Sequence, residues 1–180
     1  MYNELGDYMK FDWLSIKEPL LSWYRKNHRK LPWRETKEPY FVWLSEIMLQ
    51  QTRVEAVKGY YTRFLAEIPD IKTLSGIPED KLLKLWEGLG YYNRARNLQK
   101  AAICIMEQYE GRFPVEYEEV IKLSGIGEYT ASAICSICYD MPVAAVDGNV
   151  LRVVARLTDD HTPVDLPQYK KAVREQLERI

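Results

Sequence analysis

The stretch at residues 123–149, LSGIGEYTASAICSICYDMPVAAVDGN, decides the fold of this chain. Its SGIG motif, at residues 124–127, has two glycines on either side of one apolar residue. This pattern predicts a hairpin with positive φ at both glycines and with Ile126 as a buried anchor. We expect a helix to begin near Glu128. The first amides of a helix lack intrahelical partners and carry the positive end of its dipole, so this turn is suited to bind a phosphate group.

The second half of the stretch leads from a buried helix to a single carboxylate. Residues 130–138 are small and apolar on nearly every side, which predicts a buried helix that ends before Pro142. Asp147 is a good N-cap for a further helix at residues 150–157. Backbone amides hold a capping carboxylate in its ionised form, and Gly148 leaves room for a substrate beside it. The cap is therefore also able to stabilise a developing positive charge.

The composition predicts one hydrophobic core or two small helical lobes that share it, since the chain has 180 residues of which 47% are hydrophobic. Its net charge of -1 gives no overall basic field. The basic run at residues 25–30, with Arg34, is either a local nucleic-acid contact or a solvated surface. The sequence contains no signal peptide and no apolar run of membrane length. We therefore expect a cytoplasmic monomer without a membrane partner.

The three cysteines predict no metal site and no disulfide framework. An odd number of cysteines is typical of a reduced protein. Cys135 and Cys138 lie three residues apart in the predicted buried helix and offer at most two ligands. Packing in the core is the better interpretation of this pair.

The remaining apolar patterns predict helices and no strand, which makes the chain all-α. Residues 1–12 are expected to form a loosely ordered leader. A helix follows with a stripe of Trp13, Ile16, Leu20, Leu21 and Tyr24, in which Pro19 is tolerable only in an early turn. Further helices are predicted at residues 40–51, 53–67, 79–87, 92–109, 116–123 and 165–180. The last of these has Asp165 as its expected cap.

Glu46 is the only charged residue in the predicted helix YFVWLSEIMLQQ, at residues 40–51. On a helix it shares a face with Val42, Trp43 and Leu49. Burying a carboxylate there costs several kcal/mol unless the group is protonated or paired. A functional site explains this placement, and an arginine partner elsewhere in the core is the alternative.

Five motifs together resemble one family of DNA repair enzymes. They are LPWR at 31–34, SEIMLQQT at 45–52, GLGYY at 88–92, LSGIGEYTASAI at 123–134 and VDGN at 146–149. Taken alone, LPWR fits a packed turn with a surface arginine, and the tyrosines of GLGYY fit a core. In this order the motifs resemble the MutY-type, adenine-specific branch of the endonuclease III superfamily of helix-hairpin-helix DNA glycosylases.

The resemblance implies a fold of two helical lobes with the active site in the cleft between them. Residues 1–30 would supply a leader and a helix of the second lobe. Residues 31–140 would form a six-helix lobe that contains the helix-hairpin-helix at about 117–139. Residues 141–180 would carry the catalytic aspartate loop and the C-terminal helices of the second lobe.

The resemblance implies base excision repair, in which adenine opposite 8-oxoguanine or guanine in double-stranded DNA is released by hydrolysis. The residues support that chemistry independently, because such a reaction needs a proton for the leaving base and an anion beside an oxocarbenium-like sugar. Burial predicts a raised pKa for Glu46, which then donates the proton. Capped Asp147 is expected to remain anionic beneath the sugar.

Further site residues follow from the resemblance alone. Gln51 and Tyr91 are expected to fill the gap left by the flipped adenine, and Leu89 and Thr52 to contact the opposite base. Leu31, Trp33, Arg34 and Gln50 are expected near the base pocket, Asn149 beside Asp147, and Ser124, Gly125, Ile126 and Gly127 on a DNA phosphate.

Tyr129 separates two enzyme classes within the superfamily. In the bifunctional, endonuclease III-like enzymes a lysine at this position forms a Schiff base and nicks the strand. A phenol forms no imine, which favours a monofunctional hydrolase. The bifunctional class and an inactive helix-hairpin-helix DNA-binding fragment remain the alternatives.

The resemblance also implies an iron-sulfur cluster on four cysteines a short way beyond the last helix, followed by a Nudix-like domain that reads 8-oxoguanine. Neither occurs before Ile180. We therefore expect that the chain as given binds no cofactor and ends before the iron-sulfur loop.

Overall fold

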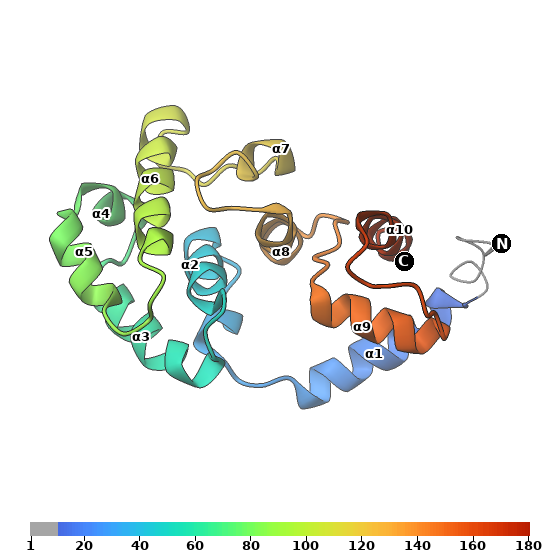
Figure 1. The fold of residues 1–180 in the computed structure, drawn as a ribbon. Coiled ribbons are helices and arrows are strands. Elements are labelled where there is room, and N and C mark those ends of the chain that lie inside the picture. The colour runs from blue at the N-terminus through green and yellow to red at the C-terminus, as the bar shows by residue number, and fades with distance from the viewer. Residues whose placement is uncertain (1–10) are drawn as a thin grey trace. The chain divides into compact units, whose positions relative to one another are not determined.

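The computed structural model describes residues 11–180, and helices are its only regular elements in this range (Figure 1). They are α1 (Trp13–Asn27), η2 (Pro32–Arg34), α2 (Pro39–Leu49), α3 (Val54–Glu67), α4 (Ile71–Gly76), α5 (Glu79–Trp86), α6 (Asn93–Gln108), α7 (Tyr117–Val120), α8 (Glu128–Tyr139), α9 (Gly148–Thr158) and α10 (Pro167–Leu177). The all-α prediction is confirmed. The leader predicted at residues 1–12 lies almost wholly outside the described residues.

The helices divide into two compact units. One unit spans Lys30–Met141, and the other combines the segment that ends at Arg29 with Pro142–Ile180. In the first unit α2 is central and packs against α3, α6 and α8, while α4 packs on α6 (Figure 1). This position follows from its sequence, because a helix that is apolar on every side has to be covered on every side. Trp43, Leu44 and Met48 of α2 are fully buried.

The other unit has its own small core, which α1, α9 and α10 share. Its buried members are Trp13, Val146, Leu151, Val154, Tyr169 and Val173, and Leu177 and Ile180 pack partly buried against them. The helix α9 is amphipathic, with its buried residues on one side and Val153 about half exposed on the other. The ammonium group of Lys17 donates to the backbone oxygen of Ile180 and so links α1 to the chain end.

The helix α4 was not predicted, and it raises the number of α-helices in residues 31–140 from the predicted six to seven. Asp70 is its N-cap, with Oδ1 accepting from the Thr73 amide at 2.7 Å. A helix of six residues is too short for an apolar period to be recognised in the sequence. The N-capping residue Asp70 was the one feature of the sequence that could have indicated the start of this helix.

The predicted bounds of three helices are wrong. The helix α2 stops at Leu49 rather than at Gln51, because Gln51 has a left-handed backbone with φ of 55°. The helix α7 has four residues rather than eight. In α10 the N-cap is Leu166, without a side-chain cap, and Pro167 occupies the first turn, so Asp165 lies one residue too early to cap it.

The apolar stripe predicted in α1 is buried only at its start. Trp13 is 4% exposed, whereas Leu20 is 57% and Tyr24 is 43% exposed. Pro19 also lies inside the helix rather than in its first turn. The helix tolerates it there at the expense of one backbone hydrogen bond. Within residues 11–180, no helix combines the length and the apolar character needed to cross a membrane.

Candidate active site

Glu46 lies on the central helix α2, where Ser45, Ile47 and Met48 beside it are buried. Burial raises the pKa of Glu46 to about 7, and the positive charge of Arg34 opposes that rise. The predicted direction of the shift is confirmed. Arg34, whose charge acts on Glu46, is exposed and so is not the core arginine of the alternative, and removal of the carboxylate from water has the larger effect on its pKa. Near neutral pH the carboxyl group is therefore able to hold a proton and to donate it.

The LPWR segment forms the turn η2 and the residue before it. Leu31 and Trp33 are buried, at 2% and 6% exposure, and the Trp33 ring meets Tyr61 edge-on with 5.2 Å between centroids. Arg34 is exposed on the same turn. The packed turn with a surface arginine is thus the observed structure. Its core residues place Arg34 where its charge acts on Glu46.

Gln50, Gln51 and Thr52 form the turn after α2. The side-chain amide of Gln50 donates to Thr130 Oγ1 of α8 at 3.5 Å. Gln51 is exposed, and its left-handed φ of 55° is unusual for a residue with a side chain. The hydroxyl of Thr52 donates to the Gln50 carbonyl at 3.3 Å.

The turn at residues 88–92 presents one aromatic side chain to solvent. Leu89 is buried, whereas Tyr91 is 64% exposed and also has a left-handed backbone, with φ of 47°. Gly88 has φ of 99°, and a Cβ atom there would lie 2.0 Å from the Tyr60 hydroxyl oxygen. The backbone angle favours a glycine at this position, and any larger residue would also displace the end of the Tyr60 side chain.

Arg94 is the residue near these turns that the sequence analysis did not identify as part of the site. Its guanidinium donates to backbone oxygens in both turns, including those of Gln50 at 2.6 Å and Leu89 at 3.0 Å. A backbone oxygen has no sequence signature. The short polar run after GLGYY was the only sign of this residue.

The hairpin at residues 124–127 has one of the two predicted positive φ angles. Gly125 has φ of 81°, and a Cβ atom there would lie 2.9 Å from the Asn97 Cβ. For Gly127 the prediction is wrong, because its φ is -98° and it serves as the extended N-cap of α8. Ile126 is buried as predicted, and the Ser124 hydroxyl donates to Asn97 Oδ1 at 3.2 Å. The helix α8 begins at Glu128 as expected.

The helix α8 is buried over its first half only. Its buried residues run from Thr130 to Cys135, whereas Ile137 is 42% exposed. The predicted burial over residues 130–138 is therefore wrong for the last turn. Tyr129 is 39% exposed and lies in the first turn of the helix.

The cysteines do not fit an iron-sulfur cluster. Among the described residues, no three of the His, Cys, Asp and Glu side chains are grouped to hold a metal. Cys104 lies on α6, and burial raises the pKa of the Cys138 thiol to about 12. Cluster ligands are thiolates, and this environment disfavours a thiolate.

Asp147 caps α9 as predicted, in the unit that does not contain Glu46. Its Oδ1 accepts from the amides of Asn149 and Val150, and its Oδ2 accepts from the Asn149 side chain, each at 2.9 Å. The oxygen of the Asn149 side chain in turn accepts from Arg152 at 2.5 Å. These donors stabilise the negative charge of Asp147 and hold it in place.

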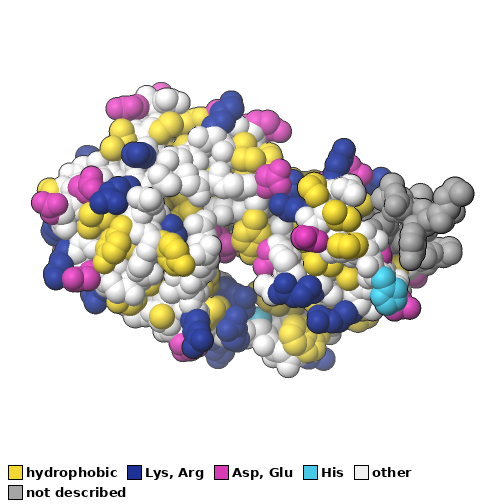
Figure 2. All heavy atoms as spheres, viewed as in Figure 1, with side chains coloured by type: hydrophobic (Ala, Val, Ile, Leu, Met, Phe, Trp, Pro, Cys, Tyr) yellow, Lys and Arg dark blue, Asp and Glu magenta, His cyan; other side chains and the backbone are white. Residues whose placement is uncertain are grey.

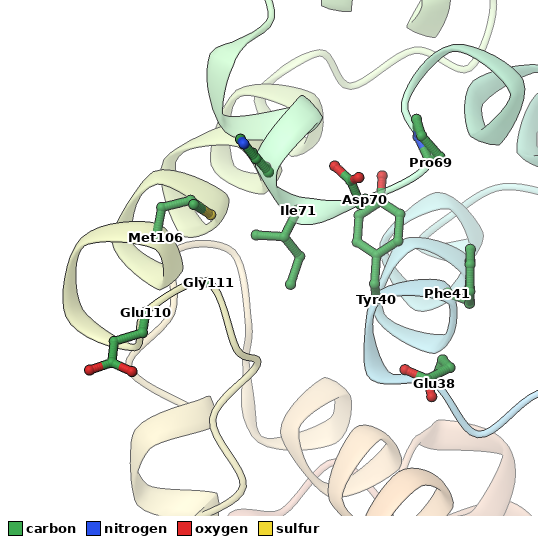
Figure 3. Close-up of a pocket in the computed structure, with 10 residues that line it drawn as sticks. Glu38, Tyr40, Phe41, Pro69, Asp70, Ile71, Met106, Glu110 and Gly111 are labelled. Carbon is green, nitrogen blue, oxygen red and sulfur yellow. The ribbon is translucent and has the colours of Figure 1, made fainter.

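An open pocket of about 460 Å³ lies elsewhere on the Glu46 unit (Figure 3). Glu38, Asp70 and Glu110 give it an acidic rim, and the hydroxyl of Tyr40 donates to the Ile68 backbone oxygen at 2.7 Å. Its described lining includes none of the residues that the sequence assigns to the site. We assign no role to it, because an acidic rim alone identifies no ligand.

The surface over α4 and α5 carries paired charges rather than a basic patch. Figure 2 shows Lys and Arg side chains interspersed with Asp and Glu at the left of the view, over these helices. The ion pairs there are Lys81 with Glu67 at 3.6 Å, Lys84 with Glu87 at 2.6 Å and Arg96 with Glu79 at 2.7 Å. Each pair is exposed, so this face is an ordinary solvated surface.

Comparison with known proteins assigns the chain to DNA repair. The family model described as HhH-GPD superfamily base excision DNA repair protein matches residues 44–180. The adenine DNA glycosylase of Buchnera aphidicola subsp. Baizongia pistaciae is 49% identical over 144 residues, which cover 79% of this chain and 41% of the relative. The mouse adenine DNA glycosylase is 42% identical over 166 residues, which cover 87% of this chain and 31% of the relative. The chain thus spans about two fifths or less of these relatives.

Solved structures have the same fold. A thermostable thymine-DNA glycosylase superposes with a TM-score of 0.84 at 28% identity, covering 92% of this chain and 76% of that one. A trapped endonuclease III–DNA covalent intermediate superposes with a TM-score of 0.68 at 20% identity, covering 91% of this chain and 82% of that one. The helix-hairpin-helix glycosylase fold that the motifs predict is confirmed.

Proposed function

Because the chain belongs to the HhH-GPD superfamily of base excision DNA repair proteins, we propose that it releases adenine from duplex DNA by hydrolysis, where adenine is opposite 8-oxoguanine or guanine. The observation that carries this proposal is Glu46, a carboxyl group on a central apolar helix whose pKa burial raises to about 7. Relatives that are 42% to 49% identical to the chain are adenine DNA glycosylases, which supports adenine as the leaving base.

The proposed reaction uses the two carboxyl groups in opposite states. Glu46 donates its proton to a ring nitrogen of adenine, which then leaves with the electron pair of the bond between C1′ and N9. The sugar becomes oxocarbenium-like, and the fixed charge of Asp147 stabilises it until water adds to C1′ and loses a proton. Asn149 keeps the Asp147 carboxylate oriented through the two hydrogen bonds that it donates.

Access to the bond requires the adenine to leave the helix stack, since the bond is shielded within the duplex. We assign the filling of the resulting gap to Gln51 and Tyr91, which are exposed at two neighbouring turns. Leu89 and Thr52 would contact the base opposite. The amides after Gly125 would bind a backbone phosphate, which positions the duplex without reading its sequence.

A single-turnover assay tests the function. The unmodified chain is mixed in excess with duplexes that hold adenine opposite 8-oxoguanine, guanine or thymine. We expect it to release adenine opposite 8-oxoguanine or guanine, and to release adenine opposite thymine far more slowly. Glu46→Gln should lose at least about 100-fold in rate while binding the lesion duplex within a few-fold, because an amide keeps the shape of the group but donates no catalytic proton. A wild-type rate in Glu46→Gln would refute the assignment of Glu46.

A further inference from the structure

Arg94 joins two turns that are about forty residues apart in the chain. Its Nη1 donates to the backbone oxygens of Ile47 at 2.9 Å, Met48 at 3.0 Å and Gln50 at 2.6 Å. Its Nη2 donates to Thr52 Oγ1 at 3.2 Å and to the backbone oxygens of Leu89 at 3.0 Å and Gly90 at 3.2 Å. One planar group therefore binds the end of α2 and the turn before α6 at the same time.

The chemistry of these acceptors requires an arginine. The last carbonyl groups of a helix have no intrahelical partner, and α2 has no basic residue in its own last turn. A guanidinium has two terminal nitrogens in a fixed fork, so that Nη1 serves the end of α2 while Nη2 serves both Thr52 and the turn after Gly88. An ammonium group has one nitrogen with three donors and is unable to span both sets of oxygens.

The two turns share an unusual backbone feature. Gln51 in the first and Tyr91 in the second both have a left-handed backbone, with φ of 55° and 47°. Residues with side chains keep such angles only where their surroundings hold them. The Arg94 guanidinium carbon lies 5.5 Å from the centroid of the Tyr91 ring, and so the same side chain also contacts the exposed aromatic residue.

The Arg94 side chain is partly buried among these acceptors. Its Nε is buried and lacks a hydrogen-bond partner among the described residues, which is unfavourable for the folded state. Burial also lowers the pKa of the Arg94 guanidinium, which shows that the charged group is partly removed from water. The terminal nitrogens of the same group bind both turns and so hold them in one relative geometry.

We propose that Arg94 is a positioning residue that locks the turn at residues 50–52 to the turn at residues 89–91, so that Gln51 and Tyr91 enter the duplex as one rigid wedge. The locking follows from the hydrogen bonds themselves, whereas the wedge rests on the proposed function. The two parts are tested separately.

Amide hydrogen exchange tests the locking without any substrate. The Thr52 amide donates to the Leu49 carbonyl at the end of α2, at 3.2 Å, and the Leu89 amide donates to the Trp86 carbonyl at the end of α5, at 3.0 Å. In Arg94→Lys both should exchange roughly tenfold faster, while the Ala131 amide of α8 should not change. Arg96→Lys is the matched control, since Arg96 lies on the same helix in an exposed ion pair with Glu79. It should leave all three rates unchanged.

A second variant tests the locking independently, in case Arg94→Lys loses its fold. Thr52→Val removes one acceptor of Arg94, and it should speed exchange of the Leu89 amide in the other turn severalfold. Loosening of only one turn by Arg94→Lys, or an unchanged Leu89 amide in Thr52→Val, would overturn the locking.

Adenine release tests the wedge. Arg94→Lys should slow release roughly 30-fold from a duplex with adenine opposite 8-oxoguanine, because the wedge offsets the cost of unstacking the base. The same variant should lose less than about threefold on a duplex in which the adenine is bulged and already unstacked. Equal losses on both duplexes would overturn the wedge. No release by the unmodified chain from either duplex would instead refute the proposed function, and the exchange result would still decide the locking.

Discussion

Asn149 donates a hydrogen bond to each oxygen of the Asp147 carboxylate, from its backbone amide to Oδ1 and from its side chain to Oδ2, both at 2.9 Å. The same carboxylate therefore caps α9 and is held in one orientation by Asn149. Both properties come from one set of contacts, so a useful variant has to keep the cap while it removes the charge.

Asp147→Asn makes this separation. Asparagine caps a helix about as well as aspartate, so we expect the free energy of unfolding to change by less than about 1 kcal/mol. Adenine release should fall by at least about 1,000-fold, because the developing positive charge loses its anion. The matched control is Asp70→Asn, at the cap of α4, where release should stay normal. Chemical denaturation and single-turnover rates give the two quantities, and a normal rate in Asp147→Asn would exclude the electrostatic role.

The raised pKa of Glu46 makes stability depend on pH. The pKa is about 7 in the folded chain against an ordinary value of 4.5, so between these values the unfolded chain has lost a proton that the folded chain keeps. The contribution of Glu46 to the free energy of unfolding therefore decreases by about 3 kcal/mol as pH rises from 4.5 to 7, and it does not change further above that range.

Glu46→Gln removes this dependence. The difference in the free energy of unfolding, variant minus unmodified chain, should be about 3 kcal/mol larger at pH 8 than at pH 4. Urea denaturation of both proteins at both pH values measures it. Glu55→Gln, at a surface ion pair with Lys58, is the control and should show no such difference. A relative stability of Glu46→Gln that is equal at both pH values would show that the carboxyl group is not held neutral.

Arg34 tunes the acid, because its positive charge lowers the pKa of Glu46 while burial raises it. Adenine release should decrease as pH rises through about 7, since only protonated Glu46 donates. In Arg34→Gln this decrease should occur at higher pH, and release at pH 8 should be severalfold closer to its maximum. Lys37→Gln, which breaks a surface ion pair with Asp140, should leave the pH profile in place. Saturating enzyme separates this effect from weaker DNA binding.

The two hairpin glycines should respond differently to alanine. Gly125→Ala puts a side chain at φ of 81° and 2.9 Å from the Asn97 Cβ, which should cost at least about 2 kcal/mol and weaken DNA binding. Gly127→Ala meets nothing within 4 Å at an extended backbone, and it should cost at most about 1 kcal/mol, for a poorer N-cap. Thermal unfolding and lesion-duplex titration measure both effects. Equal costs would contradict the hairpin geometry.

We propose that Tyr129 determines the class of reaction. Borohydride should trap no covalent adduct between the unmodified chain and DNA, because a phenol does not form the imine that borohydride reduces. Tyr129→Lys places an amine in the first turn of α8 and should produce a trapped adduct and strand nicking. Efficient trapping by the unmodified chain would identify a bifunctional enzyme instead.

Local rules were sufficient for the parts of this protein in which neighbouring residues determine one another. The start of α8 at Glu128, the capping of α9 by Asp147 and the apolar surroundings of Glu46 all follow from spacing along a few turns of chain. The helix-hairpin-helix glycosylase fold was predicted from the resemblance of the ordered motifs to a known family, and each of those motifs is a short contiguous turn or helix start.

Tertiary structure decided the features that depend on distant segments or on small conformational differences. The acceptors of Arg94 are mostly backbone oxygens, which every residue possesses, so no residue type reveals them. Gly127 was assigned a left-handed angle although the cap of the next helix holds it extended. The stripe of α1 has a helical period along its whole length, but burial at Leu20 and Tyr24 depends on what packs there. Periodicity identifies the face of a helix, and only packing decides how much of that face is covered.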